Sequence, residues 1–244
     1  MKKLILSGIL FVTSLVLVAG VVFVYFGVIS LQSPSVLRFP ARGVDVSSYQ
    51  GDIDWATLSK QGISFAFIKA TEGSGHSDDY FVPNLEGAEK AGLRAGAYHF
   101  FSFDSEADTQ FANFISVVPK GSMSLPPVID FEFYGGYHDG NLPDVNKARG
   151  SLYEMTQLLK GHYGVTPIIY CGEKMYDVFL NGQSEFADNP IWIRNIFREP
   201  SLSDGRAWTF WQYSNRTVLP GIAREYVDMN VFNGGFDEFS KFGR

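Results

Sequence analysis

Short apolar runs recur along the chain, separated by segments with helical or turn patterns. Eight of these runs have the length and the β-branched or aromatic content of strands. They cover residues 43–46, 64–70, 95–101, 127–133, 167–171, 191–196, 208–213 and 227–232. Helical patterns cover residues 54–61, 83–91, 105–116 and 144–162, and the later strands are joined by shorter, less helical segments. This alternation predicts an α/β fold with a parallel sheet, closed as a TIM-like (β/α) barrel with some helices missing.

The N-terminus carries an uncharged apolar run over residues 4–31, after the basic start Met-Lys-Lys. A bilayer core takes roughly 20 apolar residues, whereas the apolar part of a cleaved signal peptide has about 7–15. The run therefore predicts one N-terminal transmembrane helix within residues 1–31, a signal anchor, with cleavage after Gly20 as the alternative. The two lysines favour a cytoplasmic start, although two arginines beyond the run weaken this bias. A single-pass membrane protein with its domain on the periplasmic or extracellular side is expected.

The remaining chain divides into a short linker and one domain. Residues 32–41 contain two prolines and no periodicity, as expected of a linker, and residues 42–244 form the predicted domain. Hydrophobic residues make up 45% of the chain and charged residues 19%, which is typical of a globular protein. The net charge of -6, without clustered lysines and arginines, argues against a nucleic-acid partner. The single cysteine, Cys171, excludes an intrachain disulfide.

One apolar strand contains two acids. In Val-Ile-Asp-Phe-Glu-Phe, Asp130 and Glu132 share one strand face, and Phe131 and Phe133 share the other. Two buried carboxylates repel each other, and each loses its hydration, so stability alone does not select this arrangement. Paired carboxylates are the usual equipment of glycoside hydrolysis, in which an apolar setting keeps one acid protonated while the other is ionised. Glu132 suits the acid and Asp130 its ionised partner.

A structural ion pair is an equally weighted interpretation of these two acids. The candidate partners are Arg94, Arg194 and Arg206.

Other polar and aromatic residues lie in the predicted strands, whose carboxyl ends carry the chemistry in barrels of this class. Asp45 and Asp228 add carboxylates from the first and eighth strands. Aromatic side chains that could stack on sugar rings are Tyr98, Tyr134, Tyr170, Trp192, Trp211 and Tyr213, although such residues are more common in cores. The four histidines are dispersed, and neither a zinc-protease motif nor a serine-nucleophile elbow is present. No metal or cofactor is expected.

Seven motifs in chain order carry a resemblance to a known family: GVDVSSYQGDIDW, FAFIKATEG, AGLRAGAYHFF, LPPVIDFE, TPIIYCG, WTFWQY and VDMNVF. Together, from about residue 42 to residue 232, they closely resemble the family-25 glycoside hydrolases, lysozymes that act as N-acetylmuramidases. The resemblance implies a modified, flattened barrel and cleavage of the β-1,4 bond between N-acetylmuramic acid and N-acetylglucosamine in peptidoglycan strands. It also implies that Glu132 is the general acid, that Asp130 is its companion, and that Asp45 and Asp228 complete the catalytic carboxylate cluster.

The resemblance further implies that the substrate's own 2-acetamido group is the nucleophile, oriented by Asp130, with direct attack by that carboxylate as the alternative. The chain departs from the family pattern in WIRNIF, where Arg194 and Ile196 replace a small residue and an aromatic one. Arg194 is expected to bind a stem-peptide carboxylate or to occlude a sugar subsite. The other expected substrate-binding residues are Tyr98, Tyr170, Trp192, Trp211 and Tyr213.

Two other functions remain open at this level. One is a membrane-tethered, non-catalytic glycan-binding protein on the same barrel, which the four intact acids argue against. The other is a hydrolase of a different N-acetylhexosamine polymer.

Overall fold

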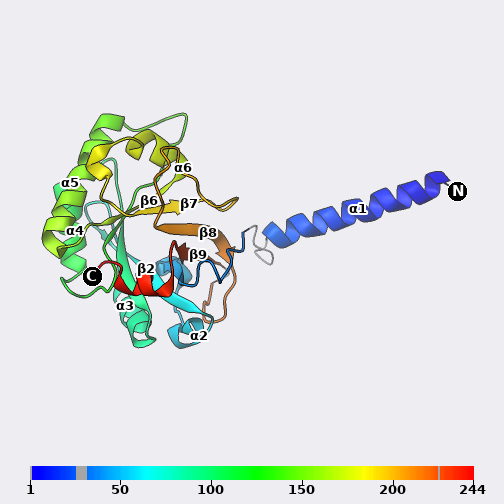
Figure 1. The fold of residues 1–244 in the computed structure, drawn as a ribbon, viewed down its shortest axis with the longest axis horizontal. Coiled ribbons are helices and arrows are strands. Elements are labelled where there is room, and N and C mark those ends of the chain that lie inside the picture. The colour runs from blue at the N-terminus through cyan, green and yellow to red at the C-terminus, as the bar shows by residue number, and fades with distance from the viewer. Residues whose placement is uncertain (1, 26–31, 225) are drawn as a thin grey trace.

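Eight strands close into a barrel in the computed structural model, which describes residues 2–25, 32–224 and 226–244 (Figure 1). The barrel strands are β1 (Arg42–Val46), β2 (Ile63–Glu72), β4 (Arg94–Phe100), β5 (Val128–Asp130), β6 (Ile168–Gly172), β7 (Ile191–Arg194), β8 (Phe210–Thr217) and β9 (Val227–Phe232). Their order is β1-β9-β8-β7-β6-β5-β4-β2, and pairing of β1 with β2 closes the ring. The two-residue β3 (His76–Ser77) pairs with the end of β2. The predicted α/β barrel is confirmed, and every predicted strand segment overlaps an observed strand.

The last strand departs from the predicted parallel sheet. β9 runs antiparallel to both of its neighbours, β1 and β8, whereas the other barrel strands pair in parallel. Residues 218–226, which join β8 to β9, are too few for the crossover of roughly a dozen or more residues that a parallel connection requires. The N-terminal end of β9 therefore lies beside the C-terminal ends of the other strands.

Apart from the N-terminal α1, which precedes all the strands, the longer helices lie outside the barrel and follow the early strands, as predicted. The helices are α1 (Lys2–Tyr25), α2 (Trp55–Ser59), α3 (Phe81–Lys90), α4 (Ala107–Val117), α5 (Val145–Tyr163), α6 (Glu173–Met175) and α7 (Phe236–Lys241). Helical turns occupy Ser48–Gln50, Tyr176–Leu180 and Ser184–Phe186. Local sequence sets the ends of α5, since the Asp144 side chain accepts hydrogen bonds from two backbone N–H groups of its first turn, and Gly164 ends it with a left-handed φ of 76°.

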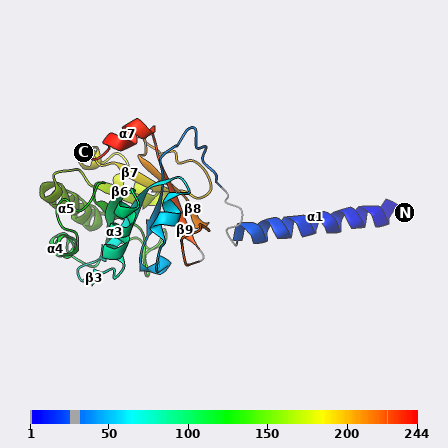
Figure 2. The same ribbon diagram turned by 90° about the horizontal axis from the view of Figure 1, so that it is seen from below.

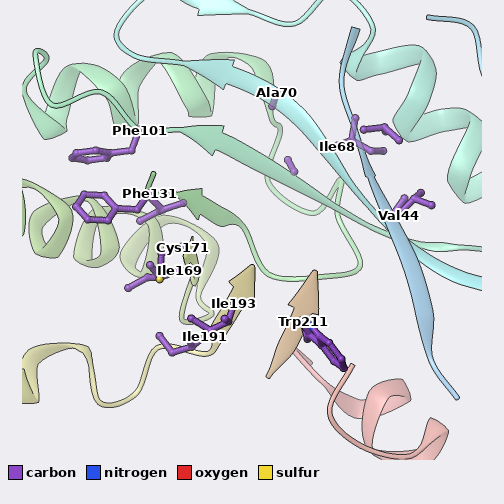
Figure 3. Close-up of a cluster of buried hydrophobic side chains, with 14 of the residues drawn as sticks. Val44, Ile68, Ala70, Phe101, Phe131, Ile169, Cys171, Ile191, Ile193 and Trp211 are labelled. Atoms are coloured by element: carbon purple, nitrogen blue, oxygen red, sulfur yellow. The ribbon is translucent and has the colours of Figure 1, made fainter. Parts of the chain in front are cut away.

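Side chains alternate across the strands and form two separate cores. The outer core packs between the barrel and the helices, and Figure 3 shows part of it, with Phe101 and Phe131 5.3 Å apart between ring centroids. The inner core fills the barrel with aromatic rings, among them Phe65, Phe67 and Phe210. Figure 2 shows the C-terminal α7 against the barrel. Its Phe239 belongs to this inner core and lies 5.3 Å from Phe65 between ring centroids. Apolar packing thus fills the barrel interior around these rings.

Two glycines make room for the inner rings. A Cβ built on Gly43 of β1 would lie 2.3 Å from the Phe65 ring, and one on Gly96 of β4 would lie 2.9 Å from the Phe67 ring. Both glycines point into the barrel, where any side chain would displace an aromatic residue. The large rings therefore fit inside the barrel only because glycines occupy the facing positions.

The segment at residues 32–41, expected as a linker, packs against the domain. Phe39 is buried and lies 5.6 Å from Trp208 and 6.3 Å from Trp211 between ring centroids. Both Arg38 guanidinium NH₂ groups donate to the carboxylate oxygens of Glu199 at 2.7 Å. The segment covers part of the outer side of β8, and in the described residues no helix lies between β7 and β8 or between β8 and β9.

The expected membrane-spanning helix is not supported. Among the residues that the structure describes, no helix has both the length and the apolar character needed to cross a membrane. Residues 26–31 of the predicted span lie outside the described part of the chain.

We expect Gly43→Ala to destabilise the domain by about 1–3 kcal/mol, because an added methyl group overpacks the barrel interior. For a domain of this size that corresponds to a fall in Tm of roughly 2–4 °C per kcal/mol, measured by thermal unfolding. Gly161→Ala is the matched control: this glycine lies in α5, and a Cβ there would meet no atom within 4 Å. Equal Tm values for the two variants would contradict the packing argument.

Candidate active site

A pocket of about 190 Å³ opens at the C-terminal ends of the parallel strands. It is lined by Asp45, Ser47, Lys69, Tyr98, Phe100, Asp130, Glu132, Tyr170, Trp192, Gln212 and Asp228. The structure therefore brings together all four acids that the sequence singled out, from β1, from the end of β5 and from β9. Asp228 reaches this end of the barrel because β9 runs antiparallel.

The sequence predicts Asp130 and Glu132 on one strand, but the structure places only Asp130 on a strand. β5 ends at Asp130, and Glu132 lies in the loop that follows. The alternation nevertheless continues beyond the strand, because the Phe131 N–H donates to the Tyr170 carbonyl at 2.8 Å and the Phe131 ring is buried in the outer core. The Glu132 side chain consequently faces the pocket, on the same side of the chain as Asp130.

Two amide side chains hold Asp45 in a fixed orientation. Gln212 donates to its carboxylate oxygens at 3.2 and 3.0 Å, and Asn230 donates to Oδ2 at 2.7 Å. The amide oxygens accept from other donors: Gln212 Oε1 from the Tyr170 hydroxyl at 3.0 Å, and Asn230 Oδ1 from the Trp192 indole N–H at 2.9 Å. An indole nitrogen can only donate, so it turns the amide NH₂ of Asn230 toward Asp45.

Asp130 is buried and lacks a hydrogen-bond partner among the described residues on one of its carboxylate oxygens. The residue is 8% exposed, and the oxygen without a partner in the described part of the chain is Oδ1. Burial raises the pKa of Asp130 well above its ordinary value, and the negative charges of Glu132 and Asp45 raise it further. The positive charge of Lys69 acts in the opposite direction.

Burial also raises the pKa values of the other three acids. For Glu132, the charge of Arg194 is the main opposing influence. For Asp45, the hydrogen bonds from Asn230 and Gln212 oppose the increase. The pKa of Asp228 is raised well above its ordinary value by burial, by the charge of Asp45 and by a hydrogen bond to that carboxylate. Ionised acids repel one another in so small a pocket, so the titration of each depends on the charge of its neighbours.

The structural ion pair, the alternative interpretation of these acids, is not found. In the described ranges, no salt bridge joins any of the four acids to an arginine. Arg94 and Arg206 donate instead to backbone carbonyls elsewhere. Arg194, at the end of β7, acts on the acids through its charge but does not line the pocket.

Sequence reasoning missed five residues of the site, which are Ser47, Lys69, Phe100, Gln212 and Asn230. Lys69 lies one strand repeat after Phe67 on the inward face of β2, and its ammonium group is 2.6 Å from Glu72 and 5.1 Å from the Phe100 ring centroid. The period of two along the strand is the signal that could have found it.

Three of the expected aromatic residues, Tyr98, Tyr170 and Trp192, line the pocket, but Trp211 and Tyr213 do not. Both of these lie on the outward face of β8, on either side of the inward Gln212. Trp211 donates to the Asn195 carbonyl at 2.7 Å, and Tyr213 accepts from Arg42 at 2.8 Å.

The comparisons with known proteins agree with this geometry. Residues 44–222 match the family model described as glycosyl hydrolases family 25. A solved structure of a family 25 glycosyl hydrolase from Bacillus anthracis has a TM-score of 0.81 and 46% identity, covering 88% of this chain and 98% of that one. A bacterial lysozyme from Streptomyces coelicolor has a TM-score of 0.76 and 29% identity, covering 83% and 96%.

Curated relatives point to the same family. Lysozyme M1 of Streptomyces globisporus is 31% identical over 202 residues, covering 79% of this chain and 68% of that protein. The uncharacterized protein YegX of Escherichia coli K12 is 35% identical over 215 residues, covering 84% and 76%. Because the family model spans most of the domain, this chain belongs to glycosyl hydrolase family 25 and is a glycoside hydrolase.

Proposed function

We propose that this protein is an N-acetylmuramidase that hydrolyses the β-1,4 bond between N-acetylmuramic acid and N-acetylglucosamine in peptidoglycan. The observation that carries the proposal is the pairing of a partly exposed acid, Glu132, with the buried and unpartnered Asp130 in one pocket. The names of two relatives support it, Lysozyme M1 and the N,O-diacetylmuramidase of Arthroderma benhamiae, which is 25% identical over 210 residues. Peptidoglycan as substrate places the working domain outside the cytoplasm.

Glu132 is the general acid in this proposal. Its raised pKa keeps a proton on the carboxyl group under conditions in which an ordinary glutamate is ionised. Arg194 and Lys69 limit that increase, so the carboxylate formed after proton transfer to the leaving oxygen is stabilised by two positive charges. The acid can therefore both donate its proton and recover one.

Asp130 orients the substrate's 2-acetamido group. A buried acceptor without a partner costs about 1–3 kcal/mol, and an amide N–H from the substrate would satisfy Oδ1. The acetamide carbonyl oxygen then attacks the anomeric carbon as the glycosidic bond breaks. A hydrogen bond from the substrate amide opposes burial, the first cause of the raised pKa of Asp130, and a proton on Glu132 removes the neighbouring charge that raises it most.

Asp45 and Asp228 form a second carboxyl pair that we assign to sugar binding. Asp45 is held by two amides, and its oxygens, together with the carboxyl group of Asp228, face the pocket. Tyr98, Tyr170 and Trp192 supply the aromatic wall on which a sugar ring packs.

Digestion of purified cell-wall sacculi tests the proposal directly. New reducing ends should be N-acetylmuramic acid. Reducing ends that are N-acetylglucosamine, or binding without new ends, would reject it in favour of a different bond or a non-catalytic glycan-binding protein.

We expect Glu132→Gln to reduce kcat by about 10² to 10⁴, because the amide has the shape of the acid but cannot donate its proton. Glycan binding and Tm should stay close to those of the unaltered protein, as measured by isothermal calorimetry and thermal unfolding. A variant that keeps more than roughly a tenth of the activity would show that Glu132 is not the acid.

Asp130→Asn should also be severely impaired, and azide distinguishes the two possible nucleophiles. If the acetamide attacks, the aspartate never bonds to the sugar, so azide should fail to restore an inverted glycosyl azide product. Product analysis by NMR gives the answer. Efficient rescue with inversion would instead indicate direct attack by Asp130.

Arg194→Met should move the basic limb of the pH profile of kcat/KM to higher pH. The arginine charge stabilises the Glu132 carboxylate and lowers its pKa, so removal of that charge keeps the acid protonated to higher pH. Arg194→Lys, which retains the charge, is the control and should shift the limb less. A shift to lower pH would contradict this electrostatic role.

A further inference from the structure

A second hollow lies between the loop that follows β4 and the loop that follows β5. It measures about 330 Å³ and shares no lining residue with the active-site pocket. We refer to it as the Tyr137 pocket; its lining includes Phe103, Asp104, Tyr137, Pro143, Asp144 and Lys147. Both loops leave the end of the barrel that carries the active site, and neither the sequence motifs nor the proposed mechanism uses this hollow.

A short path of aromatic rings joins the two pockets. Tyr134, two residues after the proposed acid, lies 5.9 Å from Phe100 of the active site and 5.3 Å from Phe103 of the Tyr137 pocket, between ring centroids. The Tyr134 and Phe103 rings are stacked, with 4° between their planes. Tyr137 packs edge-on against Phe103 at 5.3 Å. These contacts connect the linings of the two pockets, so a glycan strand that follows the rings beyond the cleavage site would reach the Tyr137 pocket.

Hydrogen bonds hold the Tyr137 pocket in shape without a ligand. The Tyr134 hydroxyl donates to Asp104 Oδ2 at 2.8 Å and accepts from the Phe103 N–H at 2.7 Å. The Tyr137 hydroxyl donates to Asp104 Oδ1 at 3.2 Å. A carboxylate has about four acceptor positions, so Asp104 can accept further hydrogen bonds from ligand hydroxyl groups. The two loops are thereby joined before a ligand arrives.

The chemistry of the lining fits an uncharged sugar ring. Aromatic faces, carboxylate acceptors and the Lys147 ammonium donor together match the apolar face and the hydroxyl and amide groups of an N-acetylhexosamine. The local charge disfavours the other part of peptidoglycan, an anionic stem peptide, because Asp104 and Asp144 line the hollow and Lys147 is already 3.4 Å from Glu106.

We propose that the Tyr137 pocket is a distal subsite that binds an N-acetylhexosamine unit of the same glycan strand, beyond the sugars at the cleavage site. This inference rests on the proposed glycan-hydrolase function. The subsite contributes only when the substrate is long enough to reach it, so the enzyme prefers long strands to short oligosaccharides.

The test compares two substrates of different length: glycan strands stripped of stem peptides, and a tetrasaccharide that occupies only the cleavage site. Tyr137→Ala should lower kcat/KM on the strands by about 3- to 10-fold and leave the tetrasaccharide value unchanged. Tyr137→Phe, which keeps the ring, should retain most of the activity on strands. Tyr153→Ala removes an exposed tyrosine of α5 that does not line the Tyr137 pocket, and should change neither value.

Each other outcome counts against the subsite. An equal loss on both substrates would mean that Tyr137 only supports the loop of Glu132, and no loss on either would mean that the hollow binds no sugar. An effect that appears only on strands that keep their stem peptides would identify the peptide as the ligand instead. If the unaltered enzyme cleaves neither substrate, the proposed function itself fails, which is a separate result.

Discussion

Four carboxyl groups share a pocket of about 190 Å³, and much of the surrounding structure limits the electrostatic cost of that crowding. Desolvation raises the pKa values of all four, and the charges of neighbouring acids add to the increase for Asp130, Glu132 and Asp228. Amide donors stabilise Asp45, while the positive charges of Lys69 and Arg194 oppose the shift of Glu132. In the proposed mechanism the same crowding supports the chemistry, because a protonated acid beside an ionised one suits acetal cleavage.

The barrel interior has two dissimilar parts. Large aromatic rings pack closely around the inward glycines, which leave them the necessary space. At the carboxyl ends of the parallel strands, the inward positions become polar, as Phe67 is followed by Lys69 on β2 and Phe210 by Gln212 on β8. One alternating pattern therefore builds a stable apolar core and, a single repeat further along each strand, a reactive pocket. Rigid strands, rather than loops, position most of the site.

Sequence reasoning predicted the barrel and the four acids because both depend on local patterns. It failed where one had to know which side chains of a strand face into the barrel. Trp211 and Tyr213 were predicted from their aromatic character, but both lie on the outward face of β8. The inward Gln212 between them was missed. It also missed the direction of β9, because the pairing of a strand depends on the whole sheet. The predicted membrane span rested on hydropathy alone and is not supported by the described residues.

Closure of the barrel joins the beginning and the end of the domain. β1 pairs with β2 on one side and with β9 on the other, and Phe39, before β1, packs against Trp208 and Trp211 near β8. These contacts connect residues far apart in sequence, and such contacts slow folding because the intervening chain must be ordered first. During synthesis, β1 can therefore pair with β9 only after the last strand has been made. Asp45 acquires its hydrogen-bond partners Gln212 and Asn230 only when the barrel closes. The hydrogen bonds that orient Asp45 thus form late, with completion of the barrel.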